Sequence, residues 1–225
     1  RSRDPARIDA ILGALRDAIP RVPFTVKPRL GFADASGWED LLALFARHPI
    51  DLLTVHGRSV ADMYRSDVRY DLIRMAVERM PCPVIANGNV SSPAHALHVL
   101  QGTGARGLMI GRGCIRNPWL FDQIREAGAG RIPRLPSGRE VLAYVTELFE
   151  ETAPHEGFHE RLQVEKLKKY MNFVGEGMEP AEPFLHQIRR ARTRADFFSI
   201  CREFMDHERP MQLVPRPTAR PQVAP

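Results

Sequence analysis

Four short apolar runs recur along the first half of the chain, and each ends in a polar or glycine-rich turn. With their turns they read FTVKPRLG (24–31), LLTVHGRS (52–59), PVIANGNV (83–90) and GLMIGRG (107–113). The runs are continuous rather than alternating, which is typical of strands covered on both faces. Each is followed by a stretch able to form a helix. The pattern predicts a parallel α/β sheet with functional residues at the carboxyl ends of its strands.

Helix signals lie before, between and after these runs. Asp4 or Ser2 can cap a helix that carries Pro5 in its first turn. Apolar spacing predicts further helices over 36–47, 70–80 and 93–100, and another can begin at the turn 111–113.

A change in composition separates this α/β region from a helical one. We expect a first domain over 1–127, a Gly/Pro linker over 128–138 and a helical domain over 139–209. The proline-rich tail 210–225 is expected to be disordered. Helices of the second domain are expected over 139–152, 158–175, 184–190 and 195–206.

Charge and cysteine content narrow the class of protein. A net charge of +5 and an isoelectric point near 9.4 permit a nucleic-acid partner without requiring one. Three widely spaced cysteines form no CxxC pair, which favours a reduced, cytoplasmic protein. No apolar run approaches the roughly 20 residues of a membrane helix, so no membrane partner is expected. The first residue is Arg1 rather than methionine, which indicates a fragment.

The strand ends carry groups suited to an anion. Lys27 and Arg29 are two residues apart on a strand, so their side chains share one face. Each group alone has a simpler explanation, since a strand-end lysine is ordinarily solvated and Asn-Gly is ordinarily a turn. Together the four turns favour a phosphate-bearing cofactor. The further groups are His56, Gly57 and Arg58 after the second run, Asn87, Gly88 and Asn89 after the third, and Gly111 and Arg112 after the fourth.

The motif set resembles the tRNA-dihydrouridine synthase family. TVKPRLG, VHGRS, PVIANGNV and LMIGRGCIRNPWLF follow in this family's order and spacing, and EKLKKYMNFV (165–174) is similar to a basic helix of its C-terminal domain. The resemblance implies a TIM (β/α)8 barrel followed by a small all-α tRNA-binding domain. It also implies an FMN-dependent enzyme that reduces uridine in tRNA to dihydrouridine with NADPH. The four runs would then be strands five to eight, the C-terminal half of the barrel.

The resemblance also assigns site residues. It places Lys27 at the flavin ring and His56 in contact with FMN, and the turns 87–89 and 111–112 at the ribityl phosphate end. Pro28 stands where the family usually has Val, Ile or Met, and Asn89 replaces a common acidic residue. The implied cofactor-binding set is Lys27, Arg29, His56, Asn87, Gly88, Asn89, Gly111 and Arg112.

No residue of this chain matches the family's proton donor. That cysteine lies in an Asn-x-x-Cys-Pro turn, and the sequence contains no such motif. Cys82 precedes its strand and is expected at the opposite rim, and Cys114 is expected to pack in a helix. We therefore expect no catalytic residue here, and the 225 residues alone are expected to be inactive.

The helical region carries a basic surface that the resemblance assigns to tRNA. An ordinary solvated helix face explains it about as well. The implied tRNA-binding residues are Arg58, Arg161, Lys166, Lys168 and Lys169, with Arg189, Arg190, Arg192 and Arg194 as a second cluster.

Several motifs are discounted, and two alternatives stay open. GTGARG (102–107) follows a helix, whereas the dinucleotide fingerprint follows a strand. HEGFH (155–159) falls in an expected turn, so no metal is expected. The alternatives are a non-catalytic tRNA-binding remnant and another FMN barrel acting on free pyrimidines or dihydroorotate. A monomer is the default expectation.

Overall fold

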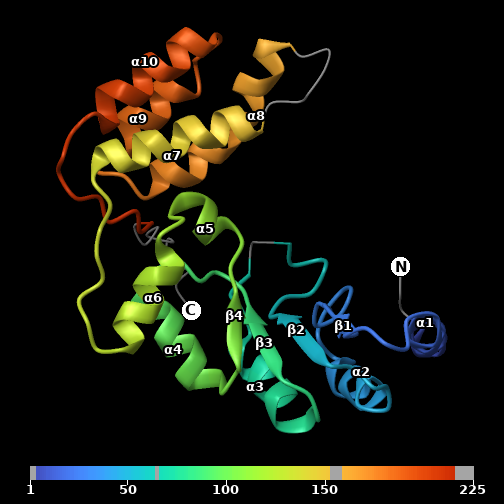
Figure 1. Ribbon diagram of the computed structural model, residues 1–225. Coiled ribbons are helices and arrows are strands. Elements are labelled where there is room, and N and C mark those ends of the chain that lie inside the picture. The colour runs from blue at the N-terminus through green and yellow to red at the C-terminus, as the bar shows by residue number, and fades with distance from the viewer. Residues whose placement is uncertain (1–3, 64–65, 153–158, 216–225) are drawn as a thin grey trace, which may run out of the picture. The chain divides into compact units, whose positions relative to one another are not determined.

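The computed structural model describes residues 4–63, 66–152 and 159–215 (Figure 1). The chain divides into two compact units, Arg1–Gly111 and Arg112–Pro225. The expected domain boundaries at 127 and 139 remain predictions. Among the described residues, no helix has the length and apolar character needed to cross a membrane.

The first unit contains a parallel four-stranded sheet, as the apolar runs predict. Its strands pair in the order β1-β2-β3-β4, so neighbours in the sheet are also neighbours in sequence (Figure 1). Four of the five residues of β2 are buried, as expected for a strand covered on both faces. The strands are β1 (Thr25–Val26), β2 (Leu52–His56), β3 (Val84–Asn87) and β4 (Gly107–Met109).

β1 is shorter than the apolar run 24–31 suggests. The ladder pairs Thr25 with Leu52 and Val26 with Leu53, and then resumes in the same register as a bridge between Arg29 and His56. Pro28 lies in the gap. It has no backbone N–H to donate, although its carbonyl still accepts from the His56 amide at 3.1 Å. The proline therefore interrupts the strand without shifting its register.

Four helices accompany the sheet, at the positions the sequence predicts. The Asp4 carboxylate accepts from the amides of Ala6 and Arg7 at 3.0 and 3.4 Å, which confirms Asp4 as the cap of α1. Consecutive helices pack side by side, and α3 and α4 lie against β2, β3 and β4 (Figure 1). The helices are α1 (Pro5–Ala18), α2 (Trp38–Phe45), α3 (Tyr70–Arg79) and α4 (Pro93–Thr103).

The core of this unit lies between the helix layer and the sheet. Leu53 and Val55 of β2 have no exposed surface, and neither has Ile73 of α3. Trp38 is 1% exposed, and its indole N–H donates to the Leu72 carbonyl at 3.0 Å. Burial of this ring and its polar group fixes α2 against α3.

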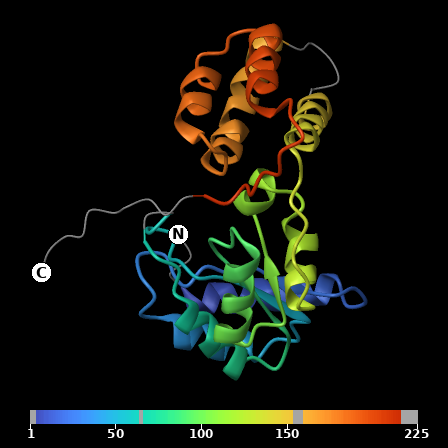
Figure 2. The same cartoon turned by 90° about the vertical axis from the view of Figure 1, so that its left-hand side faces the viewer.

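The second unit is helical in its described residues. Figure 2 shows α7 to α10, coloured yellow to red, from a second side. Phe149, Phe184 and Phe197 lie in its core with essentially no exposed surface. The sequence did not predict α6, although the other helices fall within a few residues of expectation. The helices are α5 (Arg112–Arg116), α6 (Leu120–Gly128), α7 (Gly138–Glu151), α8 (Glu160–Glu176), α9 (Ala181–Ile188) and α10 (Arg194–Met205).

The expectation of a disordered tail is wrong for residues 210–215. Pro210 bridges Ser137, and the Met211 amide donates to the Pro136 carbonyl at 2.8 Å. Met211 is 9% exposed and Leu213 is fully buried in the helical core. Two apolar side chains at alternate positions thus anchor a proline-rich segment. Residues 216–225 lie outside the described part of the chain.

The buried centre of β2 yields a stability prediction. Leu53→Ala should lower the free energy of unfolding by about 2–5 kcal/mol, because it leaves a cavity between the sheet and its helices. Urea unfolding followed by circular dichroism measures this. Leu15→Ala is the matched control, since Leu15 is 48% exposed and should cost less than about 1 kcal/mol. Equal losses for the two variants would contradict the assigned core.

The start of α7 yields a pH prediction. Ser137 and Glu140 form a capping box, and hydrogen bonds from Arg134 and then from the Ser137 backbone lower the pKa of Glu140 from 4.5 to about 2. Because this pKa is lower in the folded state, the stabilisation is present above pH 4.5 and is lost as the pH falls toward 2. The loss of melting temperature in Glu140→Gln should therefore be largest at neutral pH and shrink below about pH 4.

The control for this prediction is Glu147→Gln on the exposed surface of the same helix. Thermal melts between about pH 2.5 and 7 measure both variants against the parent protein. A Glu140→Gln deficit that stays constant across this range would show that the carboxylate charge contributes nothing to the cap.

Candidate functional site

The carboxyl ends of the strands bring the predicted groups into one row. Arg29 pairs with His56, His56 with Asn87, and Asn87 with Met109. Parallel pairing in a single register places these residues at the same edge of the sheet. The turns that follow them therefore begin side by side, as the sequence predicts.

Two cations lie at the end of β1, one exposed and one held by a hydrogen bond to a neighbouring loop. Lys27 is exposed. Arg29 is half-buried, and its Nη1 donates to the Ser59 carbonyl at 2.8 Å. His56 is 7% exposed at the next position along the edge. Lys27 is thus the solvent-facing positive charge at the end of β1, while Arg29 also ties the β1 extension to the loop after β2.

The turn after β3 has an unusual backbone. Gly88 has a φ of 147° and Asn89 a φ of 49°, the second being uncommon for a residue with a side chain. The Asn87 side-chain amide donates to the Met109 carbonyl at 2.7 Å, and the Asn87 carbonyl accepts from the Gly57 amide at 3.2 Å. Asn87 therefore fixes the position of the turn between its two neighbouring strands.

The three glycines of the site are not all explained by packing. A Cβ on Gly57 or Gly88 would lie 2.6 or 2.8 Å from the Val68 side chain, so both are needed for packing against Val68. Gly111 is exposed, and a Cβ there would meet nothing within 4 Å. A side chain would therefore fit at position 111, so packing does not explain this glycine. Arg112 begins α5 in the second unit and is half-buried.

Arg58 is placed differently from its expected role in tRNA binding. Its side chain is 1% exposed, with Nε donating to the Ser66 carbonyl at 2.8 Å and Nη1 to Asn89 Oδ1 at 3.3 Å. A guanidinium enclosed by these contacts has no surface to offer an RNA phosphate. The structure thus favours a role inside the loop after β2.

Tyr70 is a site residue that sequence reasoning missed. Its hydroxyl donates to the Gly88 carbonyl at 2.7 Å. Burial raises the pKa of Tyr70 to about 12, so the hydroxyl keeps its proton at neutral pH. Tyr70 stands at the start of α3, far from the turn in sequence, and no local pattern links the two.

The cysteines lie where the sequence predicts. Cys82 precedes β3, at the amino end of that strand, and Cys114 lies in α5. Burial raises the pKa of both thiols, and it raises the pKa of Cys201 to about 12. Neutral thiols of this kind are poor nucleophiles.

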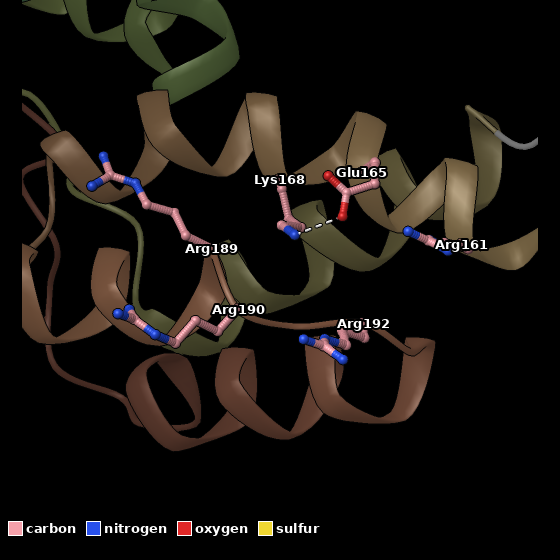
Figure 3. A pocket seen from close by; sticks show the side chains of 6 residues that line it. All are labelled: Arg161, Glu165, Lys168, Arg189, Arg190 and Arg192. Atoms are coloured by element: carbon pink, nitrogen blue, oxygen red, sulfur yellow. Dashed lines mark hydrogen bonds and ion pairs between the residues drawn. The ribbon is translucent and has the colours of Figure 1, made fainter.

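A second surface lies in the helical unit, where five cations and one carboxylate line a cleft of about 660 Å³. Figure 3 shows the side chains arriving from α8 and from the segment that joins α9 to α10. We call this cleft the basic cleft. Its lining residues are Arg161, Glu165, Lys168, Arg189, Arg190 and Arg192.

The cations of the basic cleft are held to different degrees. The Lys168 side chain is 14% exposed, and its ammonium donates to Glu165 at 2.8 Å and to the Ala191 carbonyl at 3.2 Å (Figure 3). The bond from Lys168 lowers the pKa of Glu165, which keeps this carboxylate ionised. Arg190 Nη1 donates to the His186 carbonyl at 2.8 Å, yet Arg190 and Arg192 are both exposed. Lys168 therefore stabilises the basic cleft, whereas the arginines of the cleft face the solvent.

Three of the basic residues that the sequence assigns to tRNA lie on the exposed face of α8, and Arg161 among them also lines the basic cleft. Arg161, Lys166 and Lys169 are all exposed, and the Lys166 ammonium donates to the Thr152 carbonyl at 3.2 Å. Exposed cations retain water around their charged ends, and they can exchange that water for phosphate oxygens at low cost.

The discounted motifs have the placement that the sequence predicts where it is described. GTGARG spans the end of α4 and the start of β4, the wrong order for a dinucleotide fingerprint. Residues 155–158 of HEGFH lie outside the described residues. In the described ranges, no group of three or more potential ligands could hold a metal ion.

Comparison with known proteins decides the family. The sequence matches the family described as dihydrouridine synthase (Dus) over residues 2–207. The chain belongs to the dihydrouridine synthase family. Its match covers both the strand-end turns and the helices that line the basic cleft.

The relatives include curated tRNA-dihydrouridine synthases. A probable tRNA-dihydrouridine synthase of Rickettsia conorii is 34% identical over 166 residues, covering 73% of this chain and 50% of the relative. tRNA-dihydrouridine synthase B of Pseudomonas syringae pv. tomato is 40% identical over 123 residues (54% and 36%). The same-named protein of Vibrio cholerae is 34% identical over 198 residues (85% and 59%). The chain spans about half the length of the curated relatives it matches.

The donor groups of this Dus chain fit a flavin nucleotide. The carboxyl edge of the sheet carries an exposed ammonium at Lys27, the largely buried imidazole of His56 and an exposed glycine at Gly111. Such a set suits an anionic ring system and a phosphate group.

Proposed function

We propose that the protein carrying this chain is a tRNA-dihydrouridine synthase, which reduces uridine in tRNA to dihydrouridine in the cytoplasm. FMN is the proposed bound cofactor and NADPH the reductant. The family match over residues 2–207, including both the sheet edge and the basic cleft, is the observation that carries the proposal. When bound, FMN supplies the hydride chemistry, while the protein supplies binding and orientation.

The proposed architecture is the C-terminal half of a TIM barrel followed by a tRNA-binding helical domain. Four parallel strands in sequential order, with their helices packed in a row, support a barrel segment, since a doubly wound sheet reverses its strand order. The linker over 128–138, the domains over 1–127 and 139–209, and a monomeric state are parts of the same proposal.

The chain's own residues have distinct proposed roles. Lys27 places its ammonium beside the flavin ring, where it stabilises negative charge, and His56 and Arg29 contact the cofactor. The turns formed by Asn87, Gly88 and Asn89 and by Gly111 and Arg112 hold the phosphate end through backbone and side-chain donors. Uridine must leave the RNA stack to reach this edge.

The proton required at the uracil ring has no proposed donor among these residues. Of the described cysteines, Cys82 lies at the amino end of β3, Cys114 lies in α5 and Cys201 lies in the helical core, and none of them belongs to an Asn-x-x-Cys-Pro turn. We therefore propose that the 225 residues alone form no dihydrouridine, whereas the full-length protein does.

Replacement of Lys27 tests the flavin site. In the full-length protein, Lys27→Ala should lower kcat for dihydrouridine formation at least about tenfold, because the variant has no charge beside the reacting ring. The KM for tRNA should stay close to that of the parent protein. Flavin reduction by NADPH and dihydrouridine formation are followed separately by absorbance and by nucleoside mass spectrometry.

Arg106→Ala is the control, because Arg106 is an exposed cation that precedes β4, at the amino edge of the sheet. It should leave kcat unchanged. Full turnover in Lys27→Ala would remove Lys27 from the site, and a full-length protein that binds no FMN would refute the proposed function itself.

The proposed tRNA surface consists of the basic cleft, which includes Arg161, together with Lys166 and Lys169 on α8. Its arginines contact the phosphate backbone, which positions the RNA without reading its sequence. Lys168 takes part by holding α8 to the Ala191 carbonyl rather than by meeting a phosphate.

Removal of two cleft arginines tests this surface. The double variant Arg190→Ala/Arg192→Ala should weaken tRNA binding and reduce the slope of log K against log salt concentration by about 2, one for each phosphate that a removed arginine would neutralise. Filter binding of the full-length protein at several salt concentrations gives both quantities. Arg131→Ala, in the segment between α6 and α7, is the control and should change neither. An unchanged slope in the double variant would identify the basic cleft as solvated surface only.

A further inference from the structure

The turn formed by Asn87, Gly88 and Asn89 needs support from outside itself. Its φ angles of 147° at Gly88 and 49° at Asn89 lie where residues with side chains are uncommon. Asn89 is exposed, so burial of its own side chain does not stabilise this conformation. Hydrogen bonds from neighbouring elements must therefore help to hold it.

Two side chains from neighbouring elements supply such bonds. The Tyr70 hydroxyl, at the start of α3, donates to the Gly88 carbonyl at 2.7 Å. Arg58, in the loop after β2, donates from Nη1 to Asn89 Oδ1 at 3.3 Å. One bond thus fixes the backbone of the turn and the other fixes its exposed side chain. The two donors come from different elements, so the turn is held from two sides.

Arg58 also connects the turn to the rest of the sheet edge. Its Nε donates to the Ser66 carbonyl at 2.8 Å, and its own carbonyl accepts from the Leu30 amide at 3.1 Å. The carbonyl of the next residue, Ser59, accepts the bond from Arg29 at 2.8 Å. The extension of β1, the loop after β2 and the turn after β3 are therefore joined around one buried arginine.

A buried guanidinium is costly to desolvate unless its donors are well satisfied. At 1% exposure, Arg58 has no access to a ligand in this conformation. The burial of Arg58 is explained if the protein gains from the geometry that this residue imposes on the turn 87–89.

We propose that Arg58 and Tyr70 are positioning residues that hold the turn 87–89 in the conformation that receives the phosphate end of the cofactor. This inference rests on the proposed function. Neither residue touches the cofactor, and both act through the backbone and side chain of the turn.

The test compares Tyr70→Phe and Arg58→Lys in the full-length protein. Tyr70→Phe deletes one oxygen, and Arg58→Lys keeps the charge but not the two-pronged donation. Each should raise the Kd for FMN about five- to tenfold, the effect of removing one hydrogen bond. The melting temperature of Tyr70→Phe without FMN, and the KM of both variants for tRNA, should stay close to those of the parent protein. Saturating FMN should restore kcat, which a general loss of folding would not allow.

Arg74→Lys is the matched control. Arg74 donates to the Gly102 carbonyl near the end of α4, so the substitution breaks a similar arginine–carbonyl hydrogen bond away from the carboxyl edge. It should leave the Kd for FMN unchanged. Should Arg58→Lys fail to fold, Tyr70→Phe still decides the question.

The outcomes separate the inference from the proposed function. A parent protein that binds FMN while Tyr70→Phe binds it with an unchanged Kd overturns the inference alone. An equal rise of Kd in Arg74→Lys overturns it too, because the effect is then general. A parent protein that binds no FMN overturns the proposed function and this inference with it.

Discussion

The site depends on a single parallel register across the sheet. Backbone pairing links Arg29 to His56, His56 to Asn87 and Asn87 to Met109, so four distant turns begin at one edge. A shift of one residue in any strand would turn its side chains to the other face of the sheet, and these residues would no longer be aligned. Pro28 shows how robust the register is, since the ladder lacks a donor there and resumes unshifted at Arg29.

The cations of this chain fall into two groups that differ in burial. Arg58 and Lys168 are enclosed and direct their donors to carbonyl or carboxylate oxygens of the protein. Lys27 and the arginines of the basic cleft are exposed and can give up water for a ligand's negative charge. Desolvation explains the division, because a buried cation is tolerated only with good internal partners.

The sequence predicted those elements whose signals lie within a few residues of one another. The strand-end turns, the Asp4 cap and most helices follow from hydrophobic spacing and cap residues within a few positions. The prediction was poorer where distant residues decide. Leu213, for example, lies in the segment that was expected to be disordered, and it is buried by helices that precede it in the chain. Arg58 looked like an RNA ligand because sequence does not show which arginine is covered.

The sequence by itself determined the parallel α/β character, the residues at each strand end and the family. These depend on the order and spacing of residue types, which the chain carries directly. Only the tertiary structure decided which of those residues are available and which are held. Tyr70 reaches Gly88 and Arg58 reaches Asn89 because folded elements bring them together. Exposure, like hydrogen bonding across elements, is a property of packing, and no local pattern encodes it.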